Sequence, residues 1–333
     1  MKQKPQENIR FVLSAFIRYY DLLKMYNAKN ILASKHYPEQ VIRAIDYAQE
    51  VEGVNLIIDS GAFSVWNLGG KLDVNEYIDF LSDFKVKHMS KFNEVHFVNL
   101  DVIPGNQGDK FITTQQVREA ADEGFENYLK LRDQGWDNVI HVFHQGESTE
   151  VLGRLLDTDP DYIGVSPSND SMTKARKDWL TDTFNYIEKR QGYVKTHGFA
   201  VTSIELMNKF PWFSVDSTSW FMIGMYGKLC IPLDIHGKII ADDFTPIFDK
   251  FEVSLSERKK NSTDSYNHVF LHNRAMANEI DRYMDYLYKK YQISRKQLCD
   301  HKNEGRVAAN LAMFLRFEQQ EKPQFHKPVS MFG

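Results

Sequence analysis

Short apolar runs alternate with helical stretches through the first two thirds of the chain, and this alternation limits the fold more than any other feature. Runs with the length and apolar content of buried strands cover residues 30–34, 55–60, 95–101, 138–145, 162–166, 195–201, 212–216 and 228–233. Segments with helical periodicity lie between them, at residues 75–87, 114–134, 148–156 and 175–190. Strand–helix alternation repeated about eight times predicts an α/β protein, a (β/α)₈ barrel of the TIM type.

An open, doubly wound sheet is the other fold that this alternation allows. Such a sheet normally carries a glycine-rich phosphate-binding turn after its first strand. No such turn follows residues 30–34. The barrel is therefore the favoured prediction.

The pattern changes after about residue 243. Residues 254–266 are polar and charged, which predicts an exposed loop. Residues 268–291 predict one long helix, and residues 294–317 predict a second with Ser294 as its N-cap. We therefore expect a catalytic barrel over residues 1–245 and a helical extension, packed on it, over residues 246–333.

The composition restricts where the protein works and what it binds. The chain has 333 residues and two cysteines, Cys230 and Cys299, so we expect no disulfide framework and a reducing cytoplasm. No apolar stretch approaches the roughly 18 residues of a membrane span, and no signal-peptide pattern follows Met1. The net charge is −4, so any contact with nucleic acid needs a local basic surface.

Two aspartates end apolar runs of strand length and are followed by small, turn-forming residues. Asp59 lies in the segment LIIDSGAFS and Asp216 in the segment FSVDSTSW. In a parallel barrel, such positions face the mouth at the carboxyl ends of the strands. Two carboxylates placed there can divide the work of attacking an anomeric carbon and moving a proton. Taken singly, each aspartate also fits a turn or a helix cap.

With these two segments the chain resembles the tRNA-guanine transglycosylase superfamily. Residues 59–63 are similar to its Asp-Ser-Gly-Gly-Phe/Tyr signature, and residues 213–220 to the block that carries its nucleophile, closest to the archaeosine-type form. Three further tags follow the family's order at strand ends: Leu100-Asp101, His144-Gln145-Gly146 and Ile163-Gly164-Val165-Ser166. Each tag alone is weak, but five in order are fairly specific. An unrelated barrel with acidic strand ends is the plainer alternative.

The resemblance implies base exchange at a guanosine through a covalent glycosyl-enzyme intermediate. By position, Asp216 is the nucleophile that attacks C1′. Asp59 is the general acid and base that protonates the departing purine and deprotonates the incoming one. The nucleophile must stay ionised while its partner gains and loses a proton, so their surroundings must move the two pKa values apart.

The same resemblance implies a pocket for the base. Asp101 would accept hydrogen bonds from N1–H and N2–H₂ of guanine, and Gln145 would donate its amide to O6. Backbone N–H groups would come from the region of Gly164, where the missing Cβ allows close approach, and Phe63 would stack on the base. The remaining expected pocket residues are Ser60, Gly146, Val165 and His197. Helix capping by Asp101, a loop role for Gln145, core packing of Phe63 and a structural role for His197 are the alternatives.

The chain departs from the family at its zinc site. Members bind structural zinc through a Cys-x-Cys-x-x-Cys cluster and a distant histidine, and two cysteines cannot rebuild that site. The residues that could hold a remnant metal are Cys230, Cys299, His268, His272 and His301. We therefore expect no metal and no other cofactor.

The family divides by polymer, one branch modifying tRNA and another, in phages and bacterial DNA-modification clusters, inserting 7-deazaguanines into DNA. This short, zinc-poor chain resembles the DNA branch more, so we expect DNA and a base such as 7-cyano-7-deazaguanine as its partners. A phage-encoded protein would then work in the host cytoplasm. The expected phosphate contacts are Arg258, Lys259 and Lys260.

Other functions stay open at this point. A tRNA-modifying enzyme would use the same mechanism, since attack at C1′ does not involve the 2′-OH. A non-catalytic nucleic-acid-binding paralogue would have no need of both aspartates. A glycoside hydrolase barrel more often uses glutamate as its acid. A homodimer is neither required nor excluded.

Overall fold

Parallel strands arranged as a barrel form the centre of the first part of the molecule. The computed structural model describes residues 8–14, 16–105, 109, 111–168, 173–256 and 262–320. The strands follow one another in the order β5-β4-β3-β2-β1-β9-β8-β7-β6. Their bounds are β1 Arg10–Leu13, β2 Asn30–Ser34, β3 Asn55–Asp59, β4 Glu94–Val98, β5 Val139–Ile140, β6 Val142–His144, β7 Tyr162–Ser166, β8 Lys195–Gly198 and β9 Ser214–Ser217.

The barrel closes through the run that holds β5 and β6. Only His141 separates these two strands, β5 pairs with β4, and β6 pairs with β7. They are therefore two halves of one strand, and the barrel has the eight strands of the (β/α)₈ fold. The predicted fold class is confirmed.

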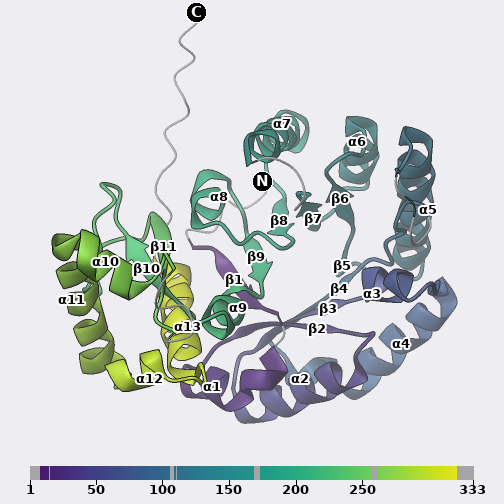
Figure 1. The fold of residues 1–333 in the computed structure, drawn as a ribbon. Coiled ribbons are helices and arrows are strands. Elements are labelled where there is room, and N and C mark those ends of the chain that lie inside the picture. The colour runs from purple at the N-terminus through teal and green to yellow at the C-terminus, as the bar shows by residue number, and fades with distance from the viewer. Residues whose placement is uncertain are drawn as a thin grey trace, which may run out of the picture. The chain divides into compact units, whose positions relative to one another are not determined.

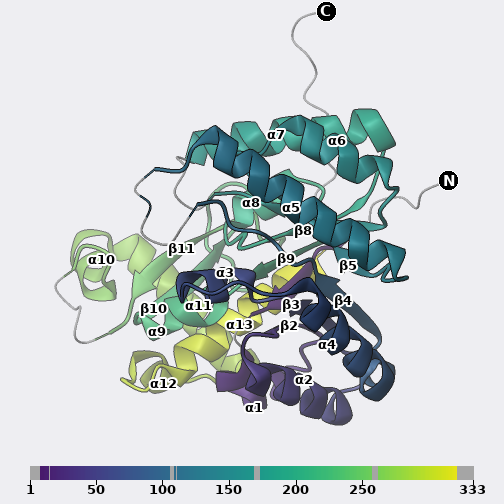
Figure 2. The same cartoon turned by 90° about the vertical axis from the view of Figure 1, so that its right-hand side faces the viewer.

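Helices follow the strands and surround the barrel on its outer side (Figures 1 and 2). Their sequences explain where they begin: Asp73 caps α4 through two backbone N–H groups, and Thr113 and Gln116 form a capping box on α5. The bounds are η1 Phe16–Tyr19, α1 Tyr20–Met25, α2 Pro38–Glu50, α3 Ala62–Asn67, α4 Val74–Lys87, η2 Met89–Lys91, α5 Thr114–Asp133, α6 Thr149–Asp157 and α7 Thr173–Gln191.

Side chains from successive strands fill the barrel interior. A buried cluster contains Val12, Ile57, Val98, Ile140, Val142, Tyr162 and Phe213, with Leu32 and Phe199 packed against it. Because neighbouring residues on a strand point to opposite sides, the interior takes every second residue. This packed interior fixes the positions of the strand ends above it.

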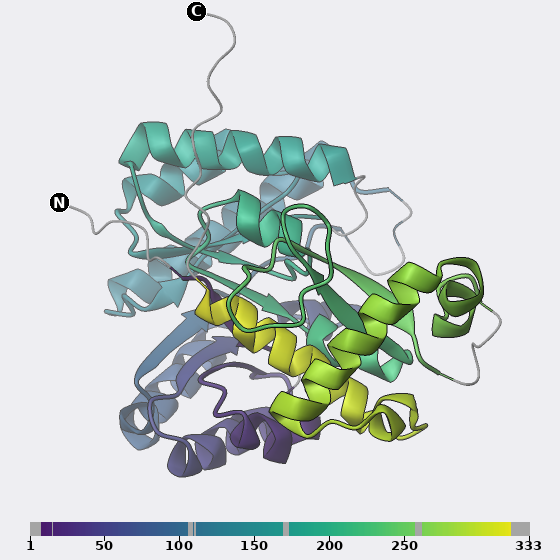
Figure 3. The ribbon, with the colours of Figure 1, turned by 90° about the vertical axis from the view of Figure 1, so that its left-hand side faces the viewer.

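The chain divides into two compact units, and all of the barrel except the start of β1 and the last residue of β9 belongs to the first, which holds Val12–Val201 and Phe210–Asp216. The second contains α8 Ile204–Lys209, α9 Ser219–Met225, β10 Lys228–Leu233, β11 Asp249–Ser254, α10 Tyr266–His272, α11 Arg274–Tyr291, α12 Arg295–Cys299 and α13 Glu304–Gln319. In this unit β10 and β11 form an antiparallel pair, and the almost completely buried helix α13, yellow in Figure 3, packs against α9 and β10.

Several predicted elements differ from those observed. Residues 228–233 do form a strand, β10, but it pairs with β11 outside the barrel, and the eighth barrel strand is instead β1, which the sequence reading missed. The predicted helix over 268–291 breaks at Asn273, and the one over 294–317 breaks after Cys299. Ser294 is confirmed as an N-cap, in a capping box with Gln297.

The predicted boundary at residue 245 falls inside the second unit, which holds the chain from Ser217 onward. Part of the predicted loop at 254–266 is the end of β11, and residues 257–261 lie outside the described residues. Across the described chain, no helix is long and apolar enough to cross a membrane.

Candidate active site

Four acidic side chains gather at the carboxyl ends of the barrel strands. Asp59 is the last residue of β3, Asp101 follows β4, Glu147 follows β6, and Asp216 lies in β9. All four belong to the first unit. The charges of Asp101 and Asp216 raise the pKa of Asp59, so these carboxyls lie near enough to interact.

Asp59 is held in a setting that favours its neutral form. Burial, followed by the charge of Asp101, raises the pKa of Asp59 to about 6, although the backbone N–H of Gly61 donates to its Oδ2 at 3.0 Å. Gly61 has φ +81°, and a Cβ there would lie 2.5 Å from Cβ of His36. Only glycine fits this turn, which brings the Gly61 N–H back onto the carboxyl group.

Asp216, by contrast, is held in a setting that favours its ionised form. The hydroxyl of Ser14 donates to Oδ2 at 2.7 Å, and the backbone N–H of Ala200 donates to Oδ1 at 2.8 Å. His197 places Nε2 3.5 Å from Oδ1. Burial alone would raise the pKa of Asp216, but His197, Ser14 and Ala200 together outweigh it and lower that pKa below its usual value.

His197 supports Asp216 from within the barrel. Its side chain has no exposed surface, and its Nδ1 bonds to the Ser214 hydroxyl, which also bonds to the Tyr162 hydroxyl. These contacts fit the structural role that was the alternative for His197, and its place in a base pocket stays a prediction. Its contact with Asp216 was not visible in the sequence, where 19 residues separate the two.

Asp101 contacts His144, the last residue of β6, and His144 in turn binds Glu147 from the loop that follows. Nε2 of His144 lies 3.2 Å from Oδ2 of Asp101, and the backbone N–H of His144 donates to Oε2 of Glu147 at 3.1 Å. Burial alone would lower the pKa of His144, but the hydrogen bond and charge of Asp101 outweigh it and raise that pKa. Burial raises the pKa of Glu147 to about 7, against the opposing charge of His144.

Neither His144 nor Glu147 has a role that the sequence alone predicts. The available signal was an acid just after Gly146, in a tag that already held a strand-end Gln145. His141, between β5 and β6, is held differently: burial lowers its pKa to about 4, and its Nδ1 contacts Asn99 at 2.9 Å.

The predicted glutamine and glycine contacts are only partly as expected. Oε1 of Gln145 accepts from the backbone N–H of Ser168 at 2.9 Å, which fixes the orientation of the amide. The N–H of Gly164 donates to the carbonyl of His141 at 2.8 Å inside the barrel, so it does not face a base as predicted. A Cβ at Gly164 would meet the Phe199 ring at 2.7 Å, so packing requires this glycine.

The other predicted pocket residues divide by exposure. Phe63 in α3 is 62% exposed, which rules out the core alternative and leaves its ring open for stacking beside Trp66, 6.1 Å away between ring centroids. Ser60 and Val165 are buried, with relative exposures of 2% and 0%. Gly146 has φ +113° and open space where a Cβ would be.

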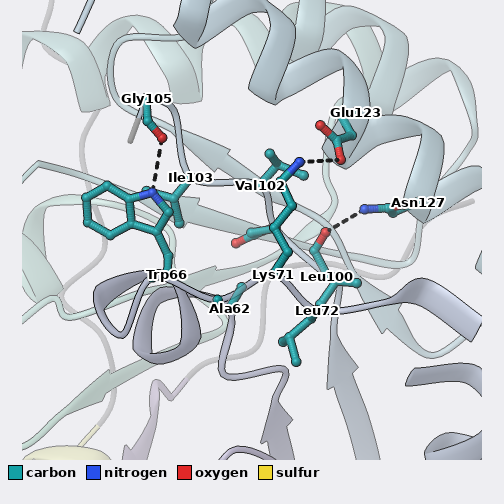
Figure 4. A pocket seen from close by; sticks show the side chains of 13 residues that line it. Ala62, Trp66, Lys71, Leu72, Leu100, Val102, Ile103, Gly105, Glu123 and Asn127 are labelled. Atoms are coloured by element: carbon teal, nitrogen blue, oxygen red, sulfur yellow. Dashed lines mark hydrogen bonds and ion pairs between the residues drawn. The ribbon is translucent and has the colours of Figure 1, made fainter. Parts of the chain in front are cut away.

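A cavity of about 180 Å³ opens beside Asp101 (Figure 4). Its walls come from α3 and the turn after it, from the loop after β4, and from α5. The lining residues include Trp66, Leu72, Leu100, Asp101, Val102 and Ile103. The walls also carry Lys71, Glu123 and Asn127, so apolar and polar side chains share the lining, as is usual in a small-molecule site.

The expected phosphate contacts and metal remnants belong to the last third of the sequence. Arg258, Lys259 and Lys260 fall outside the described residues. His268 and His272 stack at 4.2 Å between ring centroids, Cys230 is buried in β10, and Cys299 ends α12. The described residues contain no group of three or more His, Cys, Asp or Glu side chains arranged to hold a metal ion.

Comparison with known proteins finds no matching family model and no matching curated protein. Solved structures show low similarity. KGPDC from Streptococcus mutans is 8% identical, with a TM-score of 0.35, over 64% of this chain and 89% of that chain. A candidate fructose-1,6-biphosphate aldolase from Coccidioides immitis is 10% identical, with a TM-score of 0.42, over 93% of this chain and 90% of that chain. Gas2p from Saccharomyces cerevisiae, in complex with laminaritetraose and laminaripentaose, is 11% identical, with a TM-score of 0.34, over 93% and 84%.

The fold and the site together define the class of the protein: a (β/α)₈ barrel with an acidic site at the carboxyl ends of its strands.

Proposed function

We propose that this protein is an enzyme, a pentosyltransferase that replaces guanine in DNA with a 7-deazaguanine through a covalent bond between Asp216 and the sugar. One observation carries the proposal. Two carboxyls at the same barrel mouth have their pKa values moved in opposite directions, that of Asp59 up to about 6 and that of Asp216 down. Base exchange needs one proton carrier and one ionised nucleophile.

The first half of the reaction breaks the bond to guanine. An oxygen of ionised Asp216 attacks C1′ of a flipped nucleotide, and the C1′–N9 bond breaks with its electron pair moving to the purine. Protonated Asp59 gives its proton to the departing base, so guanine leaves neutral. Asp59 is then ionised and the sugar is esterified to Asp216.

The second half reverses these steps with another base. Asp59 takes the proton from N9 of the incoming 7-deazaguanine, and N9 attacks C1′. The bond from C1′ to Asp216 breaks, and its electron pair returns to the carboxylate. Ser14, Ala200 and His197 stabilise that carboxylate, which makes it a competent leaving group as well as a persistent anion.

Asp101 supplies the acceptor for the base edge in this proposal. Its Oδ2 already meets His144, so the pair presents an anchored carboxylate to N1–H and N2–H₂ of the purine. Phe63 is exposed enough to stack on the base. The N–H of Gly164 already donates to the carbonyl of His141 within the barrel. We therefore assign recognition of O6 to the Gln145 amide alone.

The test is to trap the covalent intermediate. The protein is incubated with guanine-labelled DNA or tRNA, with and without 7-cyano-7-deazaguanine, and run on a denaturing gel while label release is counted. We expect a DNA adduct and deazaguanine-dependent label release with the native chain, and neither with Asp216→Asn. Asp137→Asn is the matched control, since Asp137 is 78% exposed and lies before β5, away from the carboxyl ends of the strands.

The same experiment shows whether the polymer substrate is DNA or tRNA. Adduct and release with tRNA but not DNA would overturn the choice of DNA and keep the mechanism. An adduct that persists in Asp216→Asn would remove Asp216 from its role.

A further inference from the structure

The cavity beside Asp101 is separate from the site where the sugar would react. Asp59, Gln145 and Asp216 do not line it, and Asp101 is the one carboxylate that the cavity shares with the acidic cluster. Figure 4 shows it lying between the α3 segment, the loop after β4 and helix α5. Asp101 therefore belongs both to the lining of the cavity and to the acidic cluster.

Three contacts hold the walls of this cavity together. The indole N–H of Trp66 donates to the carbonyl of Gly105 at 3.1 Å, and the amide of Asn127 donates to the carbonyl of Leu100 at 3.2 Å. The third contact, between Lys71 Nζ and Glu123 Oε1, is 3.8 Å long, and these side chains are 85% and 54% exposed. Exposed ion pairs contribute little stability, so the side closed by Lys71 is the weakest.

The lining suits a flat heterocycle that carries N–H donors, because apolar side chains share the walls with the carboxyl groups of Asp101 and Glu123. Indole, leucine, valine and isoleucine side chains offer dispersion contacts to a ring. The carboxylate of Asp101 accepts hydrogen bonds and offers none when ionised. A volume of about 180 Å³ gives room for a bicyclic base.

We propose that this cavity is a second binding site for a free purine-type base, and that bases enter and leave the enzyme through it. The inference rests on the proposed function, in which the sugar is bonded to Asp216 while one base leaves and another arrives. During that stage the polymer covers the barrel mouth. A side cavity that shares Asp101 gives the base a path that the polymer does not block.

The experiment fills the cavity and measures base binding and base capture separately. Leu72→Trp places a large ring in the lining, and Leu68→Trp is the matched control, because Leu68 is 76% exposed and does not line the cavity. Calorimetry measures binding of guanine and 7-cyano-7-deazaguanine to the protein alone. Rapid mixing of preformed DNA adduct with 7-cyano-7-deazaguanine measures capture.

We expect Leu72→Trp to weaken base binding and slow capture at least tenfold, with adduct formation within twofold of the native rate. Leu68→Trp should match the native protein in all three. Ile103→Trp fills the cavity from the loop after β4 and gives a second variant if Leu72→Trp melts early. Native base binding and capture in a folded cavity-filling variant would overturn the inference.

The two proposals fail in different ways. If the native protein forms no adduct with either polymer, the proposed function is wrong. Calorimetry then still tests whether a free base binds in the cavity. If the adduct forms normally and the filled variants bind and capture bases as the native protein does, only the cavity inference is wrong.

Discussion

The amino ends of the barrel strands carry amide side chains, and the carboxyl ends carry carboxylates of similar size. The two groups affect the stability of the fold in opposite ways. At the amino ends, Asn55 donates to Oδ1 of Asn30 at 2.7 Å, and Asn93 donates to Oδ1 of Asn55 at 2.8 Å. Asn138 donates to the carbonyl of Val95 at 2.9 Å. These neutral amides satisfy one another across β2, β3, β4 and β5 and join neighbouring strands.

The carboxyl ends hold carboxylates where the other end holds amides. Asp59 lies four residues after Asn55 on β3, and its ionised form is disfavoured by burial and by the charges of Asp101 and Asp216. An amide ladder stabilises the fold, whereas a cluster of like charges costs stability and provides reactivity. The comparison predicts that substitutions at the two ends change stability and activity in opposite ways.

The largest expected effect is at Asp216. Asp216→Ala should abolish exchange, because it removes the carboxylate that attacks C1′ in the proposed mechanism, whose pKa its neighbours lower. Adduct formation on a denaturing gel and label release measure this. Measurable turnover with an adduct of native mobility would place the nucleophile elsewhere.

Asp59→Asn should slow base release by a factor on the order of 10²–10⁴, the usual contribution of a positioned general acid. Base release in the native protein should fall as pH rises through about 6, because the acid form is lost. Single-turnover label release across pH checks both points. A native rate in this variant would return Asp59 to a turn-forming role.

Asp101→Ala should weaken binding of the base roughly 10- to 100-fold, since hydrogen bonds to a charged group contribute about 1.5–3 kcal/mol. The maximal rate should change less, because the contact is made in the ground and transition states alike. Rates at varied 7-cyano-7-deazaguanine concentration separate the two. A lower maximal rate at unchanged affinity would contradict the assignment.

A matched pair of stability measurements tests the comparison between the two strand ends. Asn55→Ala should lower the free energy of unfolding by about 1–3 kcal/mol without changing single-turnover chemistry, since it removes two amide contacts. Asp59→Asn should raise that free energy at pH 7 by on the order of 1–3 kcal/mol. The sign follows because the folded state raises the pKa of Asp59 from 3.8 to about 6, which disfavours the ionised form above pH 6.

Denaturant unfolding at two pH values checks this pair. The gain from Asp59→Asn should shrink as pH falls from 6 toward 4, where the folded protein already holds the proton. A destabilised Asp59→Asn, or an unaffected Asn55→Ala, would break the contrast between the two ends.

The smallest effect is expected at Glu147, whose pKa burial raises to about 7. His144, Asp101 and Arg154 are the charged groups that act on it. As pH rises through 7, ionised Glu147 should hold the proton on His144 and so keep Asp101 a strong acceptor, giving a few-fold higher base affinity. Glu147→Gln should flatten that rise, and a native pH profile of base affinity in this variant would remove Glu147 from the site.

Much of the barrel could be predicted because its signals are local. Residues 30–34 and 162–166 were predicted as strands with the bounds now seen for β2 and β7. Their apolar content and flanking turns lie within a few residues of each other. By contrast, β1 has four residues, Arg10–Leu13, with no flanking signal strong enough to separate it from a short apolar segment.

The positions of the site carboxylates could be predicted from the sequence, but the contacts that set their protonation could not. Strand direction alone places Asp59, Asp101 and Asp216 at one mouth, because parallel strands share their carboxyl ends. The roles of His197, Glu147 and Gly164 depended on neighbours that the sequence does not reveal: Asp216, His144 and Phe199.

The sequence by itself determined the alternation of strands and helices and the strand ends at which the carboxylates lie. The tertiary structure alone decided which carboxyl keeps its proton. Ser14 is separated from Asp216 by 202 residues, yet its hydroxyl lies 2.7 Å from that carboxylate. A pKa depends on burial and on charges within a few ångströms in space, and only the closed barrel brings those groups together.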